Sequence, residues 1–503
     1  MTQESSTKPS PLYAVIDLGS NSFHMLITRV IANSVQTVDK VKRKVRLAAG
    51  LDENNRLNDS AMAKGLECLS FFAERLQDIP PENIRIVATA TLRIATNAKV
   101  FLTRAEKVLG RKIELLSGEE EAKRIYLGAA HTNCTSDKKL VLDIGGASTE
   151  IIVGDGFVSQ RVVSLNMGCV TFKNQFFPGG KLSSARFSQA VDAAKQQIKP
   201  LTQDYQAYGW HTVLGGSGTM QALAEILSHQ KMSVVIDLAF MHKIREQILG
   251  FDNIADIDIP GLAQERIPVL ASGLAILIAL FETLSIKQLE LANGALREGI
   301  LYEMLPNMRQ LNIRERTINS LSQRFHIDQY HAARVCNQAE NIFNQVANSW
   351  HLKKDNAFEL LIASCALHEI GLLLEYKHHQ QHGAYIIQQA DLPGFNAAER
   401  NLLAMFILHH KADICSTWAE GQSIIGLNQA RYLLAILRIA ILLCRRRQDD
   451  VLPNYQVQVT DTKIKLSLPA SWLSQHPLIE DELRQENLCL QAIDLTLNLY
   501  QVD

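Results

Sequence analysis

The chain has 503 residues, too many for one hydrophobic core, and its 47% hydrophobic and 20% charged residues are typical of a globular protein rather than a disordered one. Its 51 Lys and Arg residues nearly balance 52 Asp and Glu residues, so the net charge of −1 gives no basic surface for nucleic acid, and any anion site must be local. The eight cysteines form no CxxC pair, which argues against a zinc site or a disulfide framework and predicts reduced thiols.

The first 300 residues alternate short apolar runs, typical of strands, with segments of helical periodicity, which predicts α/β layers. Residues 1–12 contain no apolar signal core, so we expect a cytoplasmic protein. The apolar run 269–281 is shorter than the ~20 residues of a membrane span and predicts a buried helix. The expected strands are 12–17, 24–31, 35–41, 84–89, 113–116 and 140–143, and the expected helices are 61–77, 99–109 and 117–130.

An internal repeat links two parts of this α/β region. Residues 17–27 recur as residues 143–153, and both read as a strand ending in an acid, a turn of small residues, and a second strand. Two such units in one chain predict two similar lobes that face each other.

The turns of the repeat are candidate phosphate sites, because small residues let backbone N–H groups approach a phosphate closely. Asp17 and Asp143 precede these turns at strand ends, and Asp143, Glu150 and Asp17 are candidate Mg²⁺ ligands. A third loop follows the predicted strand 212–214 and lacks the Lys of a Walker A loop. The alternative is ordinary turns with solvated carboxylates. The expected phosphate-binding residues are Ser20, Asn21, Ser22, Gly145, Gly146, Ala147, Ser148, Gly216, Ser217, Gly218 and Thr219.

Two residues outside these turns are candidate catalytic groups. Ser117 and Glu120 have the spacing of a capping box, which leaves Glu121 free to face a cleft and take a proton from water. Arg93 follows a strand end, where a guanidinium could neutralise a transferring phosphoryl group or simply form a surface ion pair. The basic residues of segment 40–46 alternate, and they could attract a polyanion or form a solvated strand face.

After residue 311 long amphipathic helices replace the strand signals, and residues 457–468 then alternate as a hairpin would. This helical part is rich in histidine and is similar to a degraded HD phosphohydrolase core, in which Glu369 stands where the metal-binding Asp is diagnostic. We expect a structural or regulatory role there rather than a metal site. The histidines concerned are His368, His378, His379, His382, His409 and His410.

Four motifs together resemble the exopolyphosphatase / guanosine pentaphosphate phosphatase family, namely residues 17–25, 117–122, 143–150 and 294–299. The resemblance covers nearly the whole chain. It implies an Mg²⁺-dependent enzyme that converts pppGpp to ppGpp and phosphate and also shortens inorganic polyphosphate. It also implies that Glu121 is the catalytic base, that Asp143 and Glu150 are metal-site acids, and that Arg93 contacts phosphate. Arg445–Arg447 could contact a polyphosphate tail or be a solvated helix end.

The same resemblance implies the architecture and the assembly. Two actin-like (ASKHA, ribonuclease H-like) α/β lobes are expected at 1–125 and 126–308, a mostly α HD-like domain at 309–425 and a small α+β domain at 426–503. A homodimer is expected, with no nucleic-acid or membrane partner.

Within the family, residues 43–50 and 87–93 and Ala147 favour the guanosine pentaphosphate phosphatase branch. Three alternatives stay open at this point: an exopolyphosphatase acting mainly on inorganic polyphosphate, a sugar or acetate kinase of the same superfold, and a non-enzymatic alarmone-binding regulator.

Overall fold

The computed structural model describes residues 10–133, 138–230, 235–305, 308, 312–422 and 424–502. It divides into two compact units, the first comprising residues 1–30 and 35–313 and the second residues 31–34 and 314–503. The expected boundary at 308/309 lies at the edge of residues 309–311, which are outside the described residues, as is Cys134. The other seven cysteines are free thiols.

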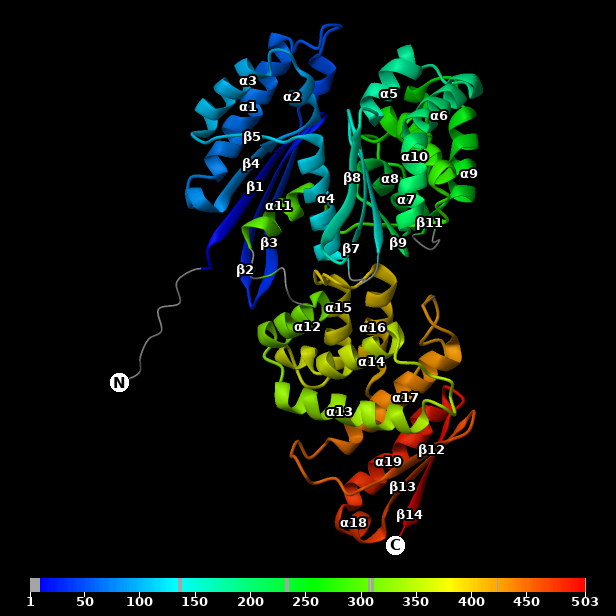
Figure 1. The fold of residues 1–503 in the computed structure, drawn as a ribbon. Helices are drawn as coiled ribbons and strands as arrows, with labels where there is room; N and C mark the ends of the chain where they lie inside the picture. The colour runs from blue at the N-terminus through cyan, green and yellow to red at the C-terminus, as the bar shows by residue number, and fades with distance from the viewer. Residues whose placement is uncertain are drawn as a thin grey trace, which may run out of the picture. The chain divides into compact units, whose positions relative to one another are not determined.

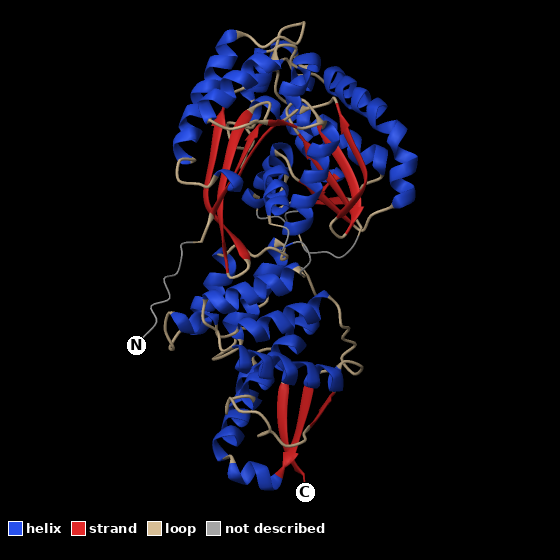
Figure 2. Cartoon of the chain, turned by 60° about the vertical axis from the view of Figure 1, so that its left-hand side comes forward, coloured by secondary structure: helices blue, strands red, loops and turns tan. Residues whose placement is uncertain are grey.

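The first unit contains two mixed sheets, which the secondary-structure colours of Figure 2 separate. One sheet has the order β3-β2-β1-β4-β5 and defines lobe I, and the other has the order β10-β11-β9-β6-β7-β8 and defines lobe II. In both, an antiparallel meander (β1-β2-β3 or β6-β7-β8) is joined by its first strand to a parallel strand (β4 or β9). The two similar lobes predicted from the repeat are therefore confirmed. The strands are β1 (Leu12–Leu18), β2 (Ser22–Ile31), β3 (Ser34–Lys44), β4 (Ile84–Ala88), β5 (Glu114–Leu115), β6 (Lys139–Ile144), β7 (Thr149–Asp155), β8 (Val158–Leu165), β9 (Thr212–Gly215), β10 (Ile236–Asp237) and β11 (Gln288–Leu291).

Helices cover the outer faces of these sheets and build a separate hydrophobic core in each lobe (Figure 1). The predicted apolar helix is α10 (Ile267–Leu284), and its apolar side chains form the centre of the lobe II core. By length and composition α10 and residues 356–373 could each cross a membrane, but 72% and 61% of them are buried inside the protein, as in core helices. The other helices are α1 (Asp59–Arg75), α2 (Ala90–Ile94), α3 (Ala98–Leu109), α4 (Gly118–Thr132), α5 (Cys169–Phe176), α6 (Ser184–Ile198), α7 (Thr202–Tyr208), α8 (Gly218–His229), α9 (Leu238–Leu249) and α11 (Leu296–Met304).

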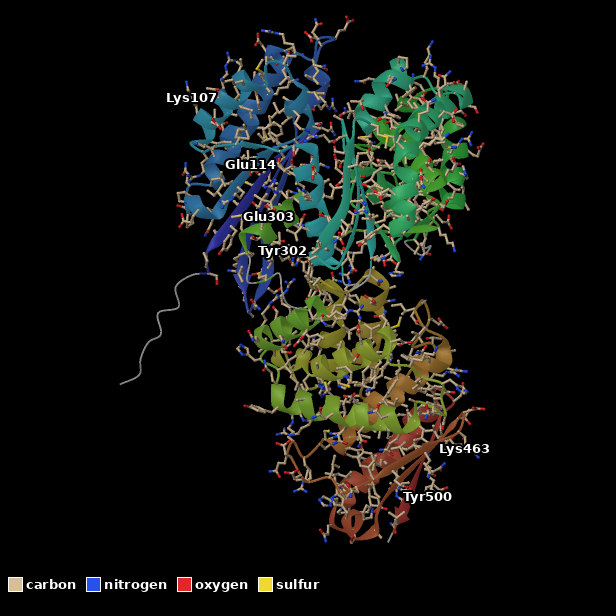
Figure 3. All side chains as sticks on the ribbon, viewed as in Figure 1. Lys107, Glu114, Tyr302, Glu303, Lys463 and Tyr500 are labelled. Atoms are coloured by element: carbon tan, nitrogen blue, oxygen red, sulfur yellow. The ribbon has the colours of Figure 1, made fainter. Side chains whose placement is uncertain are left out.

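Helices α4 and α11 join the two lobes through a core of their own, which includes residues of both sheets. The two helices can approach closely because Gly128 and Gly299 have no side chain. A Cβ at Gly128 would meet the backbone of Ala295, and a Cβ at Gly299 would meet the backbone of Arg124. Arg124 also pairs with Glu303 on α11 at 2.8 Å and with Glu114 at 3.0 Å, two acids labelled in Figure 3. The boundary expected between residues 125 and 126 therefore falls inside α4, a helix shared by both lobes.

The second unit is helical up to residue 443 and ends in a three-stranded sheet of order β12-β13-β14. The predicted hairpin at 457–468 is confirmed as the antiparallel pair β12 and β13, and β14 is parallel to β13. One hydrophobic core runs from Leu321 to Leu497, so no break in the core marks the boundary expected at 425/426. The elements are α12 (Ile313–Arg324), α13 (Gln329–Val346), α14 (Asn356–Leu367), the 3₁₀ turn η7 (Ile370–Leu373), α15 (His379–Gln389), α16 (Ala397–His409), α17 (Leu427–Leu443), β12 (Gln456–Val459), β13 (Lys463–Pro469), α18 (Ala470–Gln475), α19 (Pro477–Gln491) and β14 (Thr496–Val502).

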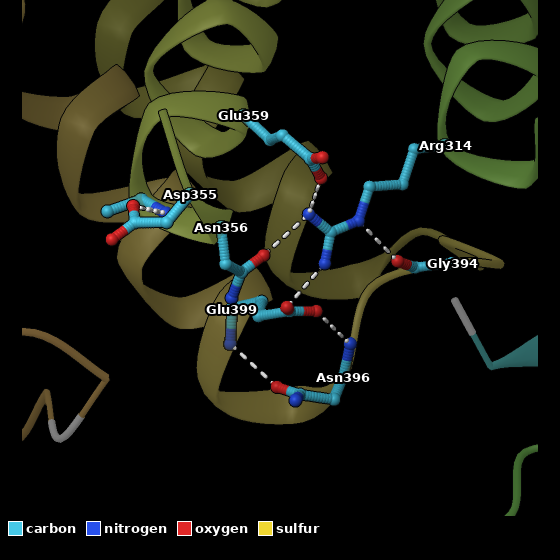
Figure 4. A network of polar contacts seen from close by, with 8 residues as sticks. Arg314, Asp355, Asn356, Glu359, Gly394, Asn396 and Glu399 are labelled. Carbon is cyan, nitrogen blue, oxygen red and sulfur yellow. Dashed lines mark hydrogen bonds and ion pairs between the residues drawn. The ribbon is translucent and has the colours of Figure 1, made fainter. Parts of the chain in front are cut away.

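A buried arginine on the first helix of this unit bonds to residues of two other helices and of a loop (Figure 4). Arg314 on α12 donates from Nη1 to Asn356 at 2.6 Å and to Glu359 at 2.7 Å, and from Nε to the carbonyl of Gly394 at 2.9 Å. Its Nη2 pairs with the buried Glu399. The guanidinium thus links α12 to α14 and to the first turn of α16.

Candidate functional site

Three loops of the first unit meet at one cavity of about 370 Å³, and all three were predicted as phosphate-binding segments. The tight turns of β1–β2 and β6–β7 come from different lobes, and a Cβ at Gly146 would lie 3.0 Å from the Cβ of Ser20. Ala147 is buried and is not among the described residues that line the cavity. The predicted residues that do line it are Ser20, Asn21, Ser22, Gly145, Gly146, Ser148, Gly216, Ser217, Gly218 and Thr219.

The predicted metal-site acids lie beside these turns at matching positions of the two hairpins. Asp17 on β1 faces His24 on β2, and Asp143 on β6 faces Glu150 on β7. Glu150 is buried and accepts a hydrogen bond from the Ser164 hydroxyl at 2.7 Å, whereas Asp17 and Asp143 keep some exposure. The structure therefore brings both lobes' acids to the wall of the same cavity.

Burial in one cavity raises the pKa values of these carboxyl groups. Burial raises the pKa of Asp17 to about 7, and burial together with the charges of Glu121 and Asp17 raises the pKa of Asp143 well above its usual range. Burial likewise raises the pKa of Glu150. The buried Oδ1 atom of Asp17 has no hydrogen-bond partner within the described part of the chain. Crowded carboxylates and an unpartnered oxygen are the chemistry that suits a hard divalent cation such as Mg²⁺.

Glu121 lines this cavity, whereas the two glutamates before it in the first turn of α4 have other partners. The capping box forms as predicted, with Glu120 accepting from the Ser117 N–H at 2.8 Å, while Glu119 pairs with Lys123 at 2.6 Å. Glu121 is the remaining acid of the first turn of α4, and it is buried and lines the cavity. Burial raises the pKa of Glu121, which suits a carboxylate that accepts a proton.

Arg93 contacts Glu121 and is not among the described residues that line the cavity. Its Nη1 donates to the Glu121 carboxylate at 2.6 Å and to the carbonyl of Leu116 at 3.1 Å. The structure therefore places Arg93 where it orients Glu121. The expected contact between Arg93 and a phosphoryl group stays a prediction.

Basic residues also line the cavity. Lys42 belongs to the segment expected to attract a polyanion, whereas Arg266 and Arg297, together with the neutral ring of His24, were not among the expected site residues. Burial, followed by the charge of Arg297, lowers the pKa of His24 to about 3. Lys42 is the one member of the basic segment 40–46 that reaches the wall within the described residues.

A local signal existed for two of these residues. His24 stands seven residues after Asp17, as Glu150 stands seven after Asp143, so the repeat itself marks its position. Arg297 lies inside the motif 294–299, at the second position of α11. Arg266 has no such pattern, because it reaches the cavity only through the loop that precedes α10.

Comparison with known proteins agrees with this geometry. Residues 26–308 match the Ppx/GppA phosphatase family, and residues 313–487 match domain III of the Ppx/GppA phosphatases. The chain belongs to the Ppx/GppA phosphatase family. The family match covers both lobes and most of the second unit, so it does not rest on the motifs alone.

Similar curated proteins extend along almost the full chain. One from Pseudoalteromonas translucida, named guanosine-5'-triphosphate,3'-diphosphate pyrophosphatase, is 48% identical and covers 95% of this chain and 96% of its own length. A protein of the same name from Photobacterium profundum is 47% identical, with 95% of both chains covered.

Solved structures support the fold of the two lobes. A Ppx/GppA family member from Aquifex aeolicus has a TM-score of 0.52 at 22% identity, covering 59% of this chain and 99% of its own. A structure described as an exopolyphosphatase from Cytophaga hutchinsonii has a TM-score of 0.54 at 22% identity, covering 59% and 98%. The expected α/β fold of two actin-like lobes is confirmed.

Proposed function

We propose that this chain removes the terminal 5'-phosphate of guanosine pentaphosphate, releasing ppGpp and phosphate, and that it also removes terminal phosphates from inorganic polyphosphate. Its relatives of 47–48% identity carry the name of the first activity. The observation that supports hydrolysis most directly is the buried Glu121, hydrogen-bonded by Arg93 and placed in a cavity lined by the three loops that the sequence predicts to bind phosphate.

The acids of the two hairpins would hold Mg²⁺. Asp143 and Glu150 of lobe II, with Asp17 of lobe I, supply the oxygen ligands that this cation prefers. When bound, the cation neutralises charge on the phosphate oxygens and on the crowded carboxylates.

The protein's own groups account for binding and proton transfer. The backbone N–H groups of the three loops bind phosphate oxygens, and Lys42, Arg266 and Arg297 balance the charge of a polyanionic substrate. Glu121 orients a water molecule for in-line attack on the terminal phosphorus and accepts its proton. Arg93 keeps the Glu121 carboxylate in one orientation.

Phosphate release from pppGpp and from long-chain polyphosphate, each with Mg²⁺ and with a chelator, tests the proposal. We expect Mg²⁺-dependent release that is faster from pppGpp and leaves ppGpp. Faster release from polyphosphate would assign the same site mainly to polyphosphate turnover. Tight pppGpp binding with no release from either substrate would refute hydrolysis and favour a regulator.

The role of Glu121 has a matched control in the same helical turn. Glu121→Gln should keep substrate binding and lose about 10²- to 10⁴-fold in turnover, the usual contribution of a general base. Glu119→Gln removes a carboxylate two positions away that lies on the exposed side of the turn. Equal turnover of the two variants would remove Glu121 as the base.

The homodimer, the cytoplasmic location and the absence of nucleic-acid and membrane partners stay predictions from the sequence. Sedimentation velocity of the purified chain tests the first, with a species of twice the 56.1 kDa chain mass expected.

A further inference from the structure

The second unit contains a compact cluster of histidines around its own cavity. Four histidines and one glutamate come from four separate helices and a connecting segment, and all five are buried at 2–8% exposure. They line a cavity of about 440 Å³. The residues are His331, His368, Glu369, His379 and His410.

Three of the rings are held in the same tautomer. The Nδ1 atoms of His368, His379 and His410 each lie within hydrogen-bond distance of the carbonyl three residues earlier in the chain, at 2.8, 2.9 and 2.6 Å. A carbonyl can only accept, so each Nδ1 carries the hydrogen and each Nε2 presents a lone pair. This arrangement, with Nδ1 fixed by a backbone carbonyl and Nε2 free to bind, is the usual one for metal-binding histidines.

Two of these lone pairs point at each other. The Nε2 atoms of His379 and His410 are 3.3 Å apart, and neither has a hydrogen to share when both Nδ1 atoms are protonated. A cation beside both nitrogens removes the repulsion.

The remaining donors complete a ligand set. One ligand atom each of His331, His368 and Glu369 lies within 4.8 Å of the other two. The ring of His368 is 5.6 Å from that of His331 and 5.5 Å from that of His410, between centroids, so His368 connects the two halves of the cluster. The Nδ1 atom of His331 is buried with no hydrogen-bond partner in the described ranges.

We propose that the cluster of His331, His368, Glu369, His379 and His410 binds a divalent transition-metal cation, separately from the hydrolytic site. Imidazole nitrogens with one carboxylate select Zn²⁺, Mn²⁺, Fe²⁺ or Co²⁺ over Mg²⁺ and Ca²⁺, which prefer all-oxygen sites. This differs from the sequence-based expectation of a structural or regulatory role. The helical periodicity did not show that the rings share one tautomer and one cavity.

Arg447 is the cation that competes for this site. It pairs with Glu369 and, at 3.3 Å, with Asp328, and its side chain is 43% exposed at the rim. The guanidinium therefore balances the buried carboxylate when no metal is bound. Arg445 and Arg446 contact Glu482 at 3.4 Å and His476 at 3.0 Å, so the triple-arginine segment has partners inside its own unit.

The experiment uses the full chain, freed of metal by a chelator and then titrated with Mn²⁺ alone. Electron spin echo spectroscopy distinguishes the two sites, because the ligands proposed for the hydrolytic site are carboxylates and those of the cluster are mainly imidazoles. We expect one Mn²⁺ with imidazole ¹⁴N couplings in addition to the Mn²⁺ held by the carboxylates of the hydrolytic site, and the ¹⁴N couplings should persist in Asp143→Asn. Mn²⁺ binding in which no bound ion shows nitrogen coupling would overturn the proposal.

Variants locate the signal. His368→Gln and the less central His379→Gln should both lose the ¹⁴N coupling, with circular dichroism confirming that each folds. His382→Gln is the matched control, since this exposed ring lies on the same helix as His379 and pairs with Glu375 at 3.3 Å. Coupling that persists in a folded His379→Gln or His368→Gln protein, or that disappears in His382→Gln, would overturn the assignment.

Two further results separate the metal site from a packing role and from the hydrolytic site. Arg447→Met removes the competing cation and should tighten Mn²⁺ binding; weaker or unchanged binding contradicts competition at Glu369. His379→Gln should leave Mg²⁺-dependent phosphate release within about twofold, the usual small effect of a change away from the reacting groups. A larger loss in the folded variant would show that the two sites are not independent.

Discussion

Replacing Arg93 with Met tests what this arginine does. The guanidinium donates to the Glu121 carboxylate at 2.6 Å, and the two side chains are only 20% and 10% exposed, so the contact is largely removed from water. Burial raises the pKa of Glu121, and Arg93 acts against this by stabilising the ionised form. Without Arg93 the pKa of Glu121 should rise further.

The magnitude follows from the contact. A hydrogen bond to a charged group contributes about 1.5–3 kcal/mol, and each 1.36 kcal/mol changes a protonation equilibrium tenfold. At a pH on the acid limb of the rate profile, Arg93→Met should therefore lower kcat/KM by about ten- to a hundredfold. The deficit should shrink as the pH rises, because a base must be ionised to work and the higher pH restores its ionised form.

The assay is phosphate release from pppGpp across the pH range, for wild type and variant. Arg85→Met is the matched control, since the guanidinium of Arg85, on a strand of the same lobe, donates to the carbonyls of Glu82 and Ile84 and to no carboxylate among the described residues. A loss of rate that is the same at every pH would refute this reasoning. That result would instead support a direct contact between Arg93 and the phosphoryl charge.

Three further outcomes concern stability. Gly299→Ala should destabilise the first unit by about 1–3 kcal/mol in urea unfolding, because its Cβ would meet the backbone of Arg124; no loss would show that α4 and α11 can separate freely. Arg314→Met should cost the second unit about 3–5 kcal/mol, as the buried Glu399 loses its partner, and clearly more than Arg334→Met at an exposed pair. In chelator, Asp17 keeps its proton up to about pH 7 when folded but only to about 3.8 when unfolded, so stability should fall as the pH rises between these values, by about 4 kcal/mol from this group. Asp17→Asn should remove that part of the slope in thermal unfolding.

The sequence predicts most of the strands and the acidic turns because their signals are local. A strand that ends in an acid and a turn of small residues occurs twice, and the structure has both hairpins where the pattern places them. The sequence also predicts Glu121 as a site residue. The capping box uses Glu120, and in a helix the next residue, Glu121, points in a different direction.

Other features depend on contacts between distant segments and have no local signal. Arg93 lies near a strand end, as the phosphate-contact hypothesis requires, yet its partner is decided by the start of α4. In the second unit the sequence shows His378 and His379 side by side. Only His379 points into the cavity, and His331 joins it from a helix almost fifty residues earlier.

The acids of the catalytic cavity belong to opposite lobes, and this gives the cleft an electrostatic preference. Burial, the charge of Glu121 and then the charge of Asp17 in lobe I raise the pKa of Asp143 in lobe II, so the ionisation of both aspartates at once is disfavoured, and the two carboxylates repel each other whenever both are charged. This repulsion acts to separate the lobes, while the core that α4 and α11 share with both sheets holds the lobes together. A bound cation, a lower pH or a higher ionic strength all weaken the repulsion, and each therefore acts in the direction of closure.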